Sequence, residues 1–452
     1  MLIQVGAQVG WTMPVNDQFK TGMLSLKMKS FQITRAKVLI NVGEFFGTIA
    51  GAASLEYFGS RNSILLSLHL MVVKWLIIFF AGSIAPVYFF LLLGGMTNAM
   101  SLCSFAIYLG EIIPNKIRGT IIAVVTSGYS IGLILGTLLD LYFNAKMFIA
   151  AQLIACCLAI YFFTWLHDTP YFLVRIGNLK KTERSIIAYF PFCNQVEKLS
   201  EIEMFVVNNS SDETKEKTKF ELFREMLTDL KTPVMRKTML TVLALFAMTN
   251  LSGSLSLSYE MILFFGVPNG YLWVYIIANL YLFLFICQID TLGRRVAYVI
   301  SSLCTSVGLI GLGIYYCLLG SYSNINFISW LPVIFIQFYI MGYLVGFMTV
   351  PFVVLSEIFP NNVKSFVTCI AILTLYLFSF IHRQVYKHIT ESLGISFALW
   401  FFGTISLFAT PIVILFLPQT RKKSFLEIQY DLIVAQQIKE LTSKGYTIKE
   451  DV

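Results

Sequence analysis

The chain has 452 residues, of which 57% are hydrophobic and only 13% are charged. Soluble domains carry about a quarter of charged residues, so this composition does not fit a water-soluble protein. It excludes nucleic-acid-binding proteins, secreted disulfide scaffolds and disordered chains, and it leaves a polytopic membrane protein. We interpret the formal net charge of +8 as a bias of the cytoplasmic loops.

The eight cysteines form no CxxC pair and no cluster with the four histidines. We therefore predict no metal site and no cofactor. The sequence also contains no nucleophile–base constellation and no nucleotide-binding loop, so the chain is not expected to be an enzyme.

Eleven apolar runs are long enough to span a bilayer, which takes about 20 residues per helix. They cover residues 38–58, 63–82, 86–110, 119–141, 147–166, 238–265, 271–289, 296–319, 327–354, 366–386 and 395–417. The first apolar stretch, 2–14, is shorter, and we interpret it as the end of a twelfth helix that is truncated. The expected fold class is an all-α membrane bundle of 12 transmembrane helices.

A long polar segment divides these spans into six and six. The predicted domains are an N-terminal six-helix half (1–166), a loop with short helices (167–237), a C-terminal six-helix half (238–417) and a tail (418–452). Most basic loop residues fall on the side of the long loop, which predicts that the loop and both termini are cytoplasmic. The basic stretch 20–37 lies on the opposite side and does not fit this bias.

Two motifs recur about half a chain apart. Residues 111–118 (EIIPNKIR) return as 357–364 (EIFPNNVK), and 56–61 (EYFGSR) returns as 290–295 (DTLGRR). Two matches in the same order indicate two homologous halves, and transporters work by rocking such repeats about a central site.

The repeated acids and bases indicate an electrostatic latch that forms in one conformation and breaks in the other. Gly59 and Gly293 permit the tight turns that present the basic residues. Simple membrane anchoring needs only Lys and Arg and leaves Glu111 and Glu357 unexplained. The predicted latch comprises Arg61, Glu111, Arg118, Asp290, Arg294, Arg295, Glu357 and Lys364.

Further motifs resemble those of the sugar porters of the major facilitator superfamily, and most of all the insect facilitated trehalose transporters. They are GWTMP (10–14), YLGE (108–111), DTP (168–170), LSG (251–253), VPF (350–352), EIFP (357–360) and PQT (418–420). The resemblance covers almost the whole chain. It implies a major-facilitator bundle, inward- and outward-facing states, and a midplane site for a small polar solute.

The resemblance also implies substrate-binding positions, several of which depart from the family pattern. The helix 5 glutamine is Thr126 here, the helix 10 tryptophan is Phe352, and the helix 4 arginine falls on Leu91. Buried sugar hydroxyls need hydrogen-bonding partners, and aromatic faces cover the apolar side of the ring. The predicted substrate-binding residues are Thr126, Thr249, Asn250, Asn279, Phe352 and Tyr376.

Two acids, Glu44 and Glu260, lie inside predicted spans. Membrane-embedded carboxylates usually have a function, so either residue is a possible site for a proton or a cationic solute. The alternative is a carboxylate near the extracellular mouth that water solvates. The family resemblance implies that proton-driven sugar porters carry an acid in helix 1. In this chain residues 5–11 of that helix contain no acid, and Gln8 is their only polar side chain. This favours passive transport.

We therefore predict facilitative transport of a sugar, trehalose or a hexose, by a multi-pass plasma-membrane protein that acts as a monomer. Its partners are the sugar and the lipid bilayer, and no nucleic acid. The alternative is a transporter-like nutrient sensor, or a paralogue with altered substrate and weak or no sugar transport. A helical receptor or channel is less favoured, because it predicts no repeated acidic and basic motifs.

Overall fold

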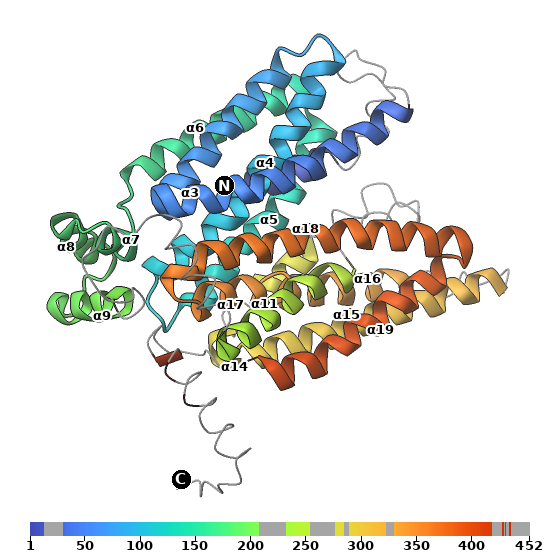
Figure 1. Cartoon of the computed structure of the whole chain (residues 1–452). Helices are drawn as coiled ribbons and strands as arrows, with labels where there is room; N and C mark the ends of the chain where they lie inside the picture. Colours follow the sequence, from blue (N-terminus) through green and yellow to red (C-terminus); the bar gives the residue numbers. More distant parts are fainter. Residues whose placement is uncertain are drawn as a thin grey trace, which may run out of the picture.

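The computed structural model describes residues 1–12, 30–207, 232–253, 276–283, 289–321 and 330–417, together with 427, 428, 430 and 434. Within these ranges every regular element is a helix (Figure 1). The all-α fold class predicted from hydropathy is therefore confirmed for this part of the chain.

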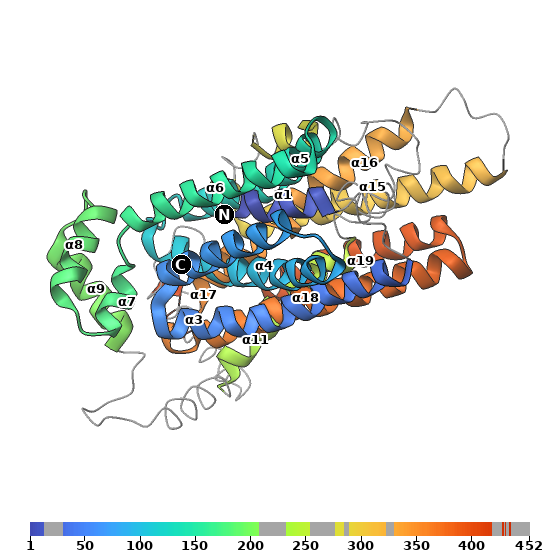
Figure 2. The same ribbon diagram turned by 90° about the horizontal axis from the view of Figure 1, so that it is seen from above.

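The helices form two groups that follow each other along the chain (Figures 1 and 2). The first group comprises α1 (Leu2–Thr12), α3 (Ser30–Phe79), α4 (Ile84–Ile112), α5 (Arg118–Tyr142) and α6 (Ala145–Trp165). The second comprises α11 (Pro233–Leu251), α14 (Ile289–Leu292), α15 (Arg294–Ser321), α16 (Leu331–Gly342), η2 (Tyr343–Phe347), α17 (Val350–Ile358), α18 (Asn361–Ser392) and α19 (Ile395–Phe416). We call them the N-terminal and C-terminal groups.

Three short helices, α7 (Pro170–Arg175), α8 (Leu179–Tyr189) and α9 (Gln195–Val207), lie beyond one end of the bundle in both views (Figures 1 and 2). They occupy part of the polar segment in which we expected short helices. We call this side of the molecule the α7–α9 end.

Nine helical stretches of the described residues are long and apolar enough to cross a membrane. The predicted spans 38–58 and 63–82 are joined in the single helix α3, whose helical geometry breaks at Gly59 with φ of 79°. The predicted span 327–354 is built from α16, η2 and α17 in succession. The predicted spans 238–265 and 271–289 fall partly outside the described residues.

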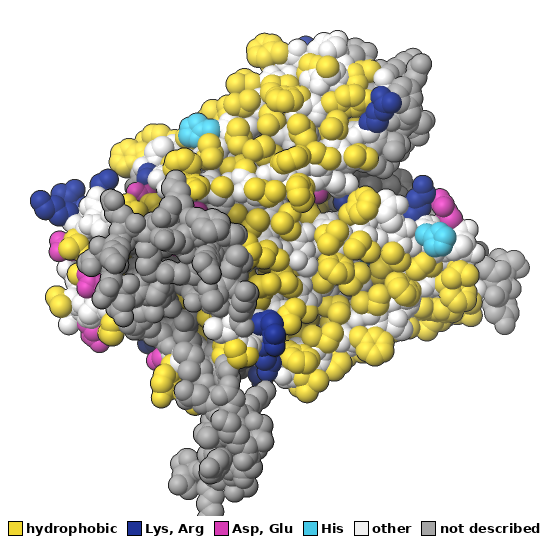
Figure 3. Space-filling model, in the orientation of Figure 1, with side chains coloured by type: hydrophobic (Ala, Val, Ile, Leu, Met, Phe, Trp, Pro, Cys, Tyr) yellow, Lys and Arg dark blue, Asp and Glu magenta, His cyan; other side chains and the backbone are white. Residues whose placement is uncertain are grey.

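Large apolar side chains cover the flanks of both groups (Figure 3). On α6, for example, Tyr161, Phe162 and Trp165 are 57%, 66% and 72% exposed. Long helices that carry apolar side chains on their outer faces are suited to contact with lipid rather than water. The chain is thus a multi-pass membrane protein.

Rows of glycines bring neighbouring helices into backbone contact. A Cβ atom built on Gly47 of α3 would lie 2.4 Å from the Met96 carbonyl oxygen of α4. A Cβ atom built on Gly132 of α5 would lie 2.0 Å from the Ile3 carbonyl oxygen of α1. Such seams are typical of membrane helices, where close backbone packing replaces the hydrophobic effect. Both rows repeat every four residues: Gly43, Gly47 and Gly51 on α3, and Gly128, Gly132 and Gly136 on α5.

Candidate functional site

The two helix groups are joined by an ion pair near the α7–α9 end. Oε1 of Glu111, at the end of α4, lies 3.5 Å from Nζ of Lys364, at the start of α18. The Ser60 hydroxyl donates to Oε2 of Glu111 at 3.4 Å. Both charged side chains are almost fully buried, at 8% and 4% exposure. Two residues of the predicted latch therefore meet across the groups.

A second pair of predicted latch residues meets inside the C-terminal group. Nη2 of Arg294 on α15 donates to Oε1 of Glu357 on α17 at 2.8 Å, and the two side chains are 1% and 2% exposed. Gly293, with φ of 93°, forms the turn that begins α15 and directs Arg294 inward. The glycine turns expected at Gly59 and Gly293 are both present.

Arg61, beside the Gly59 turn of α3, binds residues at the end of α6 and just beyond it. Its Nη1 lies 3.4 Å from Asp168 Oδ1, and its Nη2 donates to the Thr164 carbonyl oxygen at 2.7 Å. On the other side of the turn, Arg175 of α7 lies 3.1 Å from Glu56. Asp168 and Arg175 are missing from the predicted latch, although the DTP motif at 168–170 contains the first of them.

The remaining predicted latch residues bind backbone or amide oxygens. Nη2 of Arg118 donates to Asn115 Oδ1 at 2.6 Å, and Nε of Arg295 donates to the Leu417 carbonyl oxygen. The side chain of Asp290 lies outside the described part of the structure. The charged residues at the α7–α9 end thus have two roles. Some join the two groups, and others hold the turns within one group.

A chain of hydroxyl groups ties α8 to the bundle. The phenol of Tyr189 lies 3.0 Å from that of Tyr108 on α4 and donates to the His167 carbonyl oxygen at 2.7 Å. Burial raises the pKa of Tyr189 above its ordinary value, because desolvation disfavours the phenolate. The group therefore remains a neutral donor at physiological pH.

Most of the predicted substrate-binding side chains bond to protein groups. The Thr249 hydroxyl donates to the Phe347 carbonyl oxygen, and the Asn250 amide donates to that of Leu375, both at 2.8 Å. Thr126 donates to the Ala123 carbonyl oxygen in its own helix. The Ser130 hydroxyl of α5 donates to Asn279 Oδ1 at 2.5 Å, which links the N-terminal group to the described helical segment 276–283. Tyr376 of α18 is half-buried.

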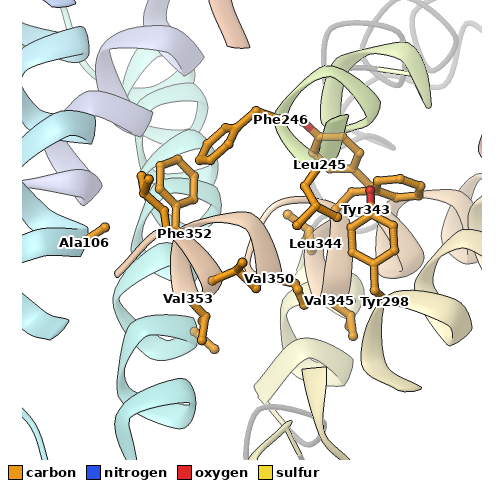
Figure 4. Close-up of a cluster of buried hydrophobic side chains, with 14 of the residues drawn as sticks. Ala106, Leu245, Phe246, Tyr298, Tyr343, Leu344, Val345, Val350, Phe352 and Val353 are labelled. Atoms are coloured by element: carbon orange, nitrogen blue, oxygen red, sulfur yellow. The ribbon is translucent and has the colours of Figure 1, made fainter. Parts of the chain in front are cut away.

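Phe352 lies in a cluster of rings that crosses from one group to the other. Its centroid is 5.0 Å from that of Phe105 on α4 and 5.2 Å from that of Phe246 on α11. The three side chains are buried, and Figure 4 shows Phe352 between Phe246 and α4. We call Phe105, Phe246 and Phe352 the ring cluster. It lies between α4 of the N-terminal group and α11 and α17 of the C-terminal group.

The chain matches a known protein family over most of its length. The model of the family described as "Sugar (and other) transporter" matches residues 7–432. The chain belongs to this family. Its members are transporters and not enzymes.

Relatives and solved structures agree with this membership. The transporter is 25% identical to the facilitated trehalose transporter Tret1 of Polypedilum vanderplanki over 93% of this chain and 84% of that one. Its identity with Tret1 of Anopheles gambiae is 23%, over 93% and 54% of the two chains. The structure of the proton:xylose symporter XylE bound to 6-bromo-6-deoxy-D-glucose superimposes with a TM-score of 0.78 at 16% identity, over 95% and 97% of the chains. The transporter thus has the major facilitator fold.

Of the two acids predicted inside spans, Glu44 lies at the seam between α3 and α18. The positive charge of Arg383 on α18 acts on it, and Nη2 of Arg383 donates to Asn41 Oδ1 of α3 at 2.8 Å. Glu44 is half-buried in this position. Glu260 lies outside the described residues. The prediction that Glu44 binds a proton or a cation therefore stays a prediction, now with Arg383 as its neighbour.

Sequence reasoning missed a buried cation of the transporter, Lys74. This side chain of α3 is 1% exposed, and its Nζ donates to Gln8 Oε1 of α1 and to Thr97 Oγ1 of α4. The signal was present as a single lysine in the middle of the apolar run 63–82. Only the fold shows that the side chain points into the N-terminal group.

Proposed function

We propose that the transporter moves a sugar across the plasma membrane by facilitated diffusion, through alternating exposure of a central site. The observation that carries the proposal is the Glu111–Lys364 ion pair between the two groups, and the ring cluster is a second contact between them. A contact between moving halves holds one conformation and must open in the other. The described conformation is therefore closed at the α7–α9 end.

The α7–α9 end is proposed to face the cytoplasm, with both chain termini on that side. This placement follows the excess of Lys and Arg in the loops at this end. We keep the boundaries 1–166, 167–237, 238–417 and 418–452 for the two halves, the loop and the tail. We also propose that the transporter acts as a monomer.

The proposed substrate is trehalose or a hexose, and the names of two relatives support trehalose. The proposed substrate-binding set offers neutral hydroxyls and amides together with aromatic rings, which suits an uncharged sugar. The described helix α1, with sequence LIQVGAQVGWT, contains no acid. We therefore propose that substrate flows down its own gradient without a coupled proton.

The test is uptake of labelled trehalose, glucose and xylose by cells that display the chain on their surface. We expect saturable uptake of at least one labelled sugar. The labelled sugar should enter faster when the cells are preloaded with the same sugar in unlabelled form. Accumulation above the external concentration that an uncoupler abolishes would contradict facilitated diffusion. Binding of a sugar without any uptake would favour the sensor alternative instead.

A further inference from the structure

Lys74 joins three helices of the N-terminal group through one ammonium group. Its Nζ donates to Gln8 Oε1 on α1 and lies 3.1 Å from Thr97 Oγ1 on α4. The Thr97 hydroxyl donates its own hydrogen to the Gly94 carbonyl oxygen at 3.0 Å, so it acts as an acceptor toward Lys74. The junction therefore has a defined direction, with the lysine as donor to both neighbours.

The ammonium is buried without an ion pair among the described residues. No carboxylate of that part of the chain lies within 4.0 Å of Nζ. The Cys156 thiol of α6 is a titratable group of another helix that acts on it electrostatically. A charge inside a membrane bundle is costly, and such residues usually have a function in transport.

Gln8 is held on both sides of its amide group. Lys74 binds its oxygen, and a Cβ atom at Gly94 would approach its nitrogen to 2.3 Å. The amide fits against α4 only because position 94 has no side chain. On its other face α1 packs on α5, where a Cβ atom at Gly6 would lie 1.9 Å from the Tyr129 carbonyl oxygen. Helix α1 is thus fixed in position between α5 and the Lys74 junction.

We propose that Lys74 is a positioning residue for transport: through Gln8 it keeps α1 attached to α3 and α4, so that these helices move together. The proposal rests on the proposed transport function. Without the junction, α1 shifts against its neighbours, and the conformational step becomes slower while the affinity for substrate changes little.

The experiment compares Lys74→Met with Lys74→Arg and with the double variant Lys74→Gln/Gln8→Lys, which exchanges donor and acceptor. Surface quantity is measured by biotinylation, and kcat and KM by uptake of labelled trehalose or of the sugar that wild type takes up fastest. Lys74→Met should lower kcat per surface molecule by about 10-fold, with KM within about 2-fold of wild type. The exchanged pair should recover at least part of kcat, because the hydrogen bond between α1 and α3 is restored. Lys146→Met, which removes an exposed lysine of α6, is the matched control.

The outcomes separate positioning from packing. If Lys74→Met lowers only the surface quantity and leaves kcat unchanged, Lys74 is a packing residue and the proposal is wrong. If this variant does not reach the surface, Thr97→Val and Gln8→Leu each remove one acceptor of the junction, and unchanged kcat in both would also overturn the proposal. Absence of uptake by wild type would contradict the proposed function instead.

Discussion

Glu111 and Lys364 form an ion pair that joins the acid of one repeated motif to the base of the other. Glu111 opens the motif 111–118, Lys364 closes the motif 357–364, and their Oε1 and Nζ atoms are 3.5 Å apart. The acid of the second motif, Glu357, binds Arg294 in its own group instead. Of these two ion pairs, Glu111–Lys364 links the two groups and Arg294–Glu357 lies within one, so the two copies of the motif contribute differently.

Exchanging the charges of this pair tests the link. Glu111→Lys alone places two cations together and should open the α7–α9 end and lower the uptake rate about 10-fold or more. The double variant Glu111→Lys/Lys364→Glu should recover part of the rate, because attraction between the groups returns. The measurement is initial uptake per surface molecule. A double variant no better than the single variants would mean that the contact is incidental to transport.

Loss of Arg294 should act mainly on stability. Its partner Glu357 is 2% exposed, and Arg294→Ala removes the ion-pair partner of that buried carboxylate at a cost of about 3–5 kcal/mol. We expect a lower melting temperature of the detergent-solubilised protein and less protein at the cell surface. The matched control is Lys387→Ala, because the Lys387–Glu391 pair on α18 is 71% and 66% exposed and contributes little. An unchanged melting temperature for Arg294→Ala would contradict this role.

The ring cluster allows two interpretations of Phe352 to be separated. If Phe352 covers the sugar ring, Phe352→Leu raises KM and Phe105→Leu does not. If the cluster closes the passage between the groups, as its packing indicates, both variants change the uptake rate alike and leave KM nearly constant. We expect the second result, because in the described conformation Phe105 and Phe246 both pack against Phe352. Uptake kinetics of the two variants decide between these cases.

The glycine seams should tolerate no side chain. Gly47→Ala would place a Cβ atom 2.4 Å from the Met96 carbonyl oxygen, which forces α3 and α4 apart. We expect little folded protein by size-exclusion chromatography of a fluorescent fusion. Gly82→Ala is the control, since no atom lies within 4 Å of a Cβ built there. Equal elution profiles for both variants would show that the α3–α4 seam can relax.

The sequence predicted the fold because hydropathy and a repeated motif are local signals. Apolar runs predicted the long helices, and the motifs at 111–118 and 357–364 contain Glu111, Glu357 and Lys364 of the two buried ion pairs. The pairing of these charged residues was less predictable. Arg61 pairs with Asp168, and Glu111 pairs with Lys364 of the other group. Pairing depends on which helices the fold brings together, and spacing along the chain does not contain this information.

Lys74 and the glycine rows were missed for a different reason. A single lysine hardly changes the hydropathy of a span, and its direction depends on how α3 is rotated within the bundle. Spaced glycines such as Gly43, Gly47 and Gly51 are visible in the sequence, but their role requires a neighbouring backbone. Phe352 was assigned to substrate by resemblance, whereas its ring contacts became visible only in the structure.

The orientation in the membrane can be tested by glycosylation. The chain contains the sequons Asn208-Asn-Ser210 and Asn209-Ser-Ser211, which follow directly after α9. If the α7–α9 end is cytoplasmic, these asparagines never meet the lumenal glycosylation machinery and carry no glycan. Helix α3 runs from Ser30 to the Gly59 turn, where a Cβ atom would contact Phe172 of α7, so α3 begins at the side opposite to the α7–α9 end. Gln18→Thr creates the sequon Asn16-Asp-Thr ahead of α3 in the sequence, and we expect this variant alone to show a glycosidase-sensitive increase in mass. A mass shift in the wild-type chain that disappears when both Asn208 and Asn209 are changed to Gln would reverse the proposed orientation.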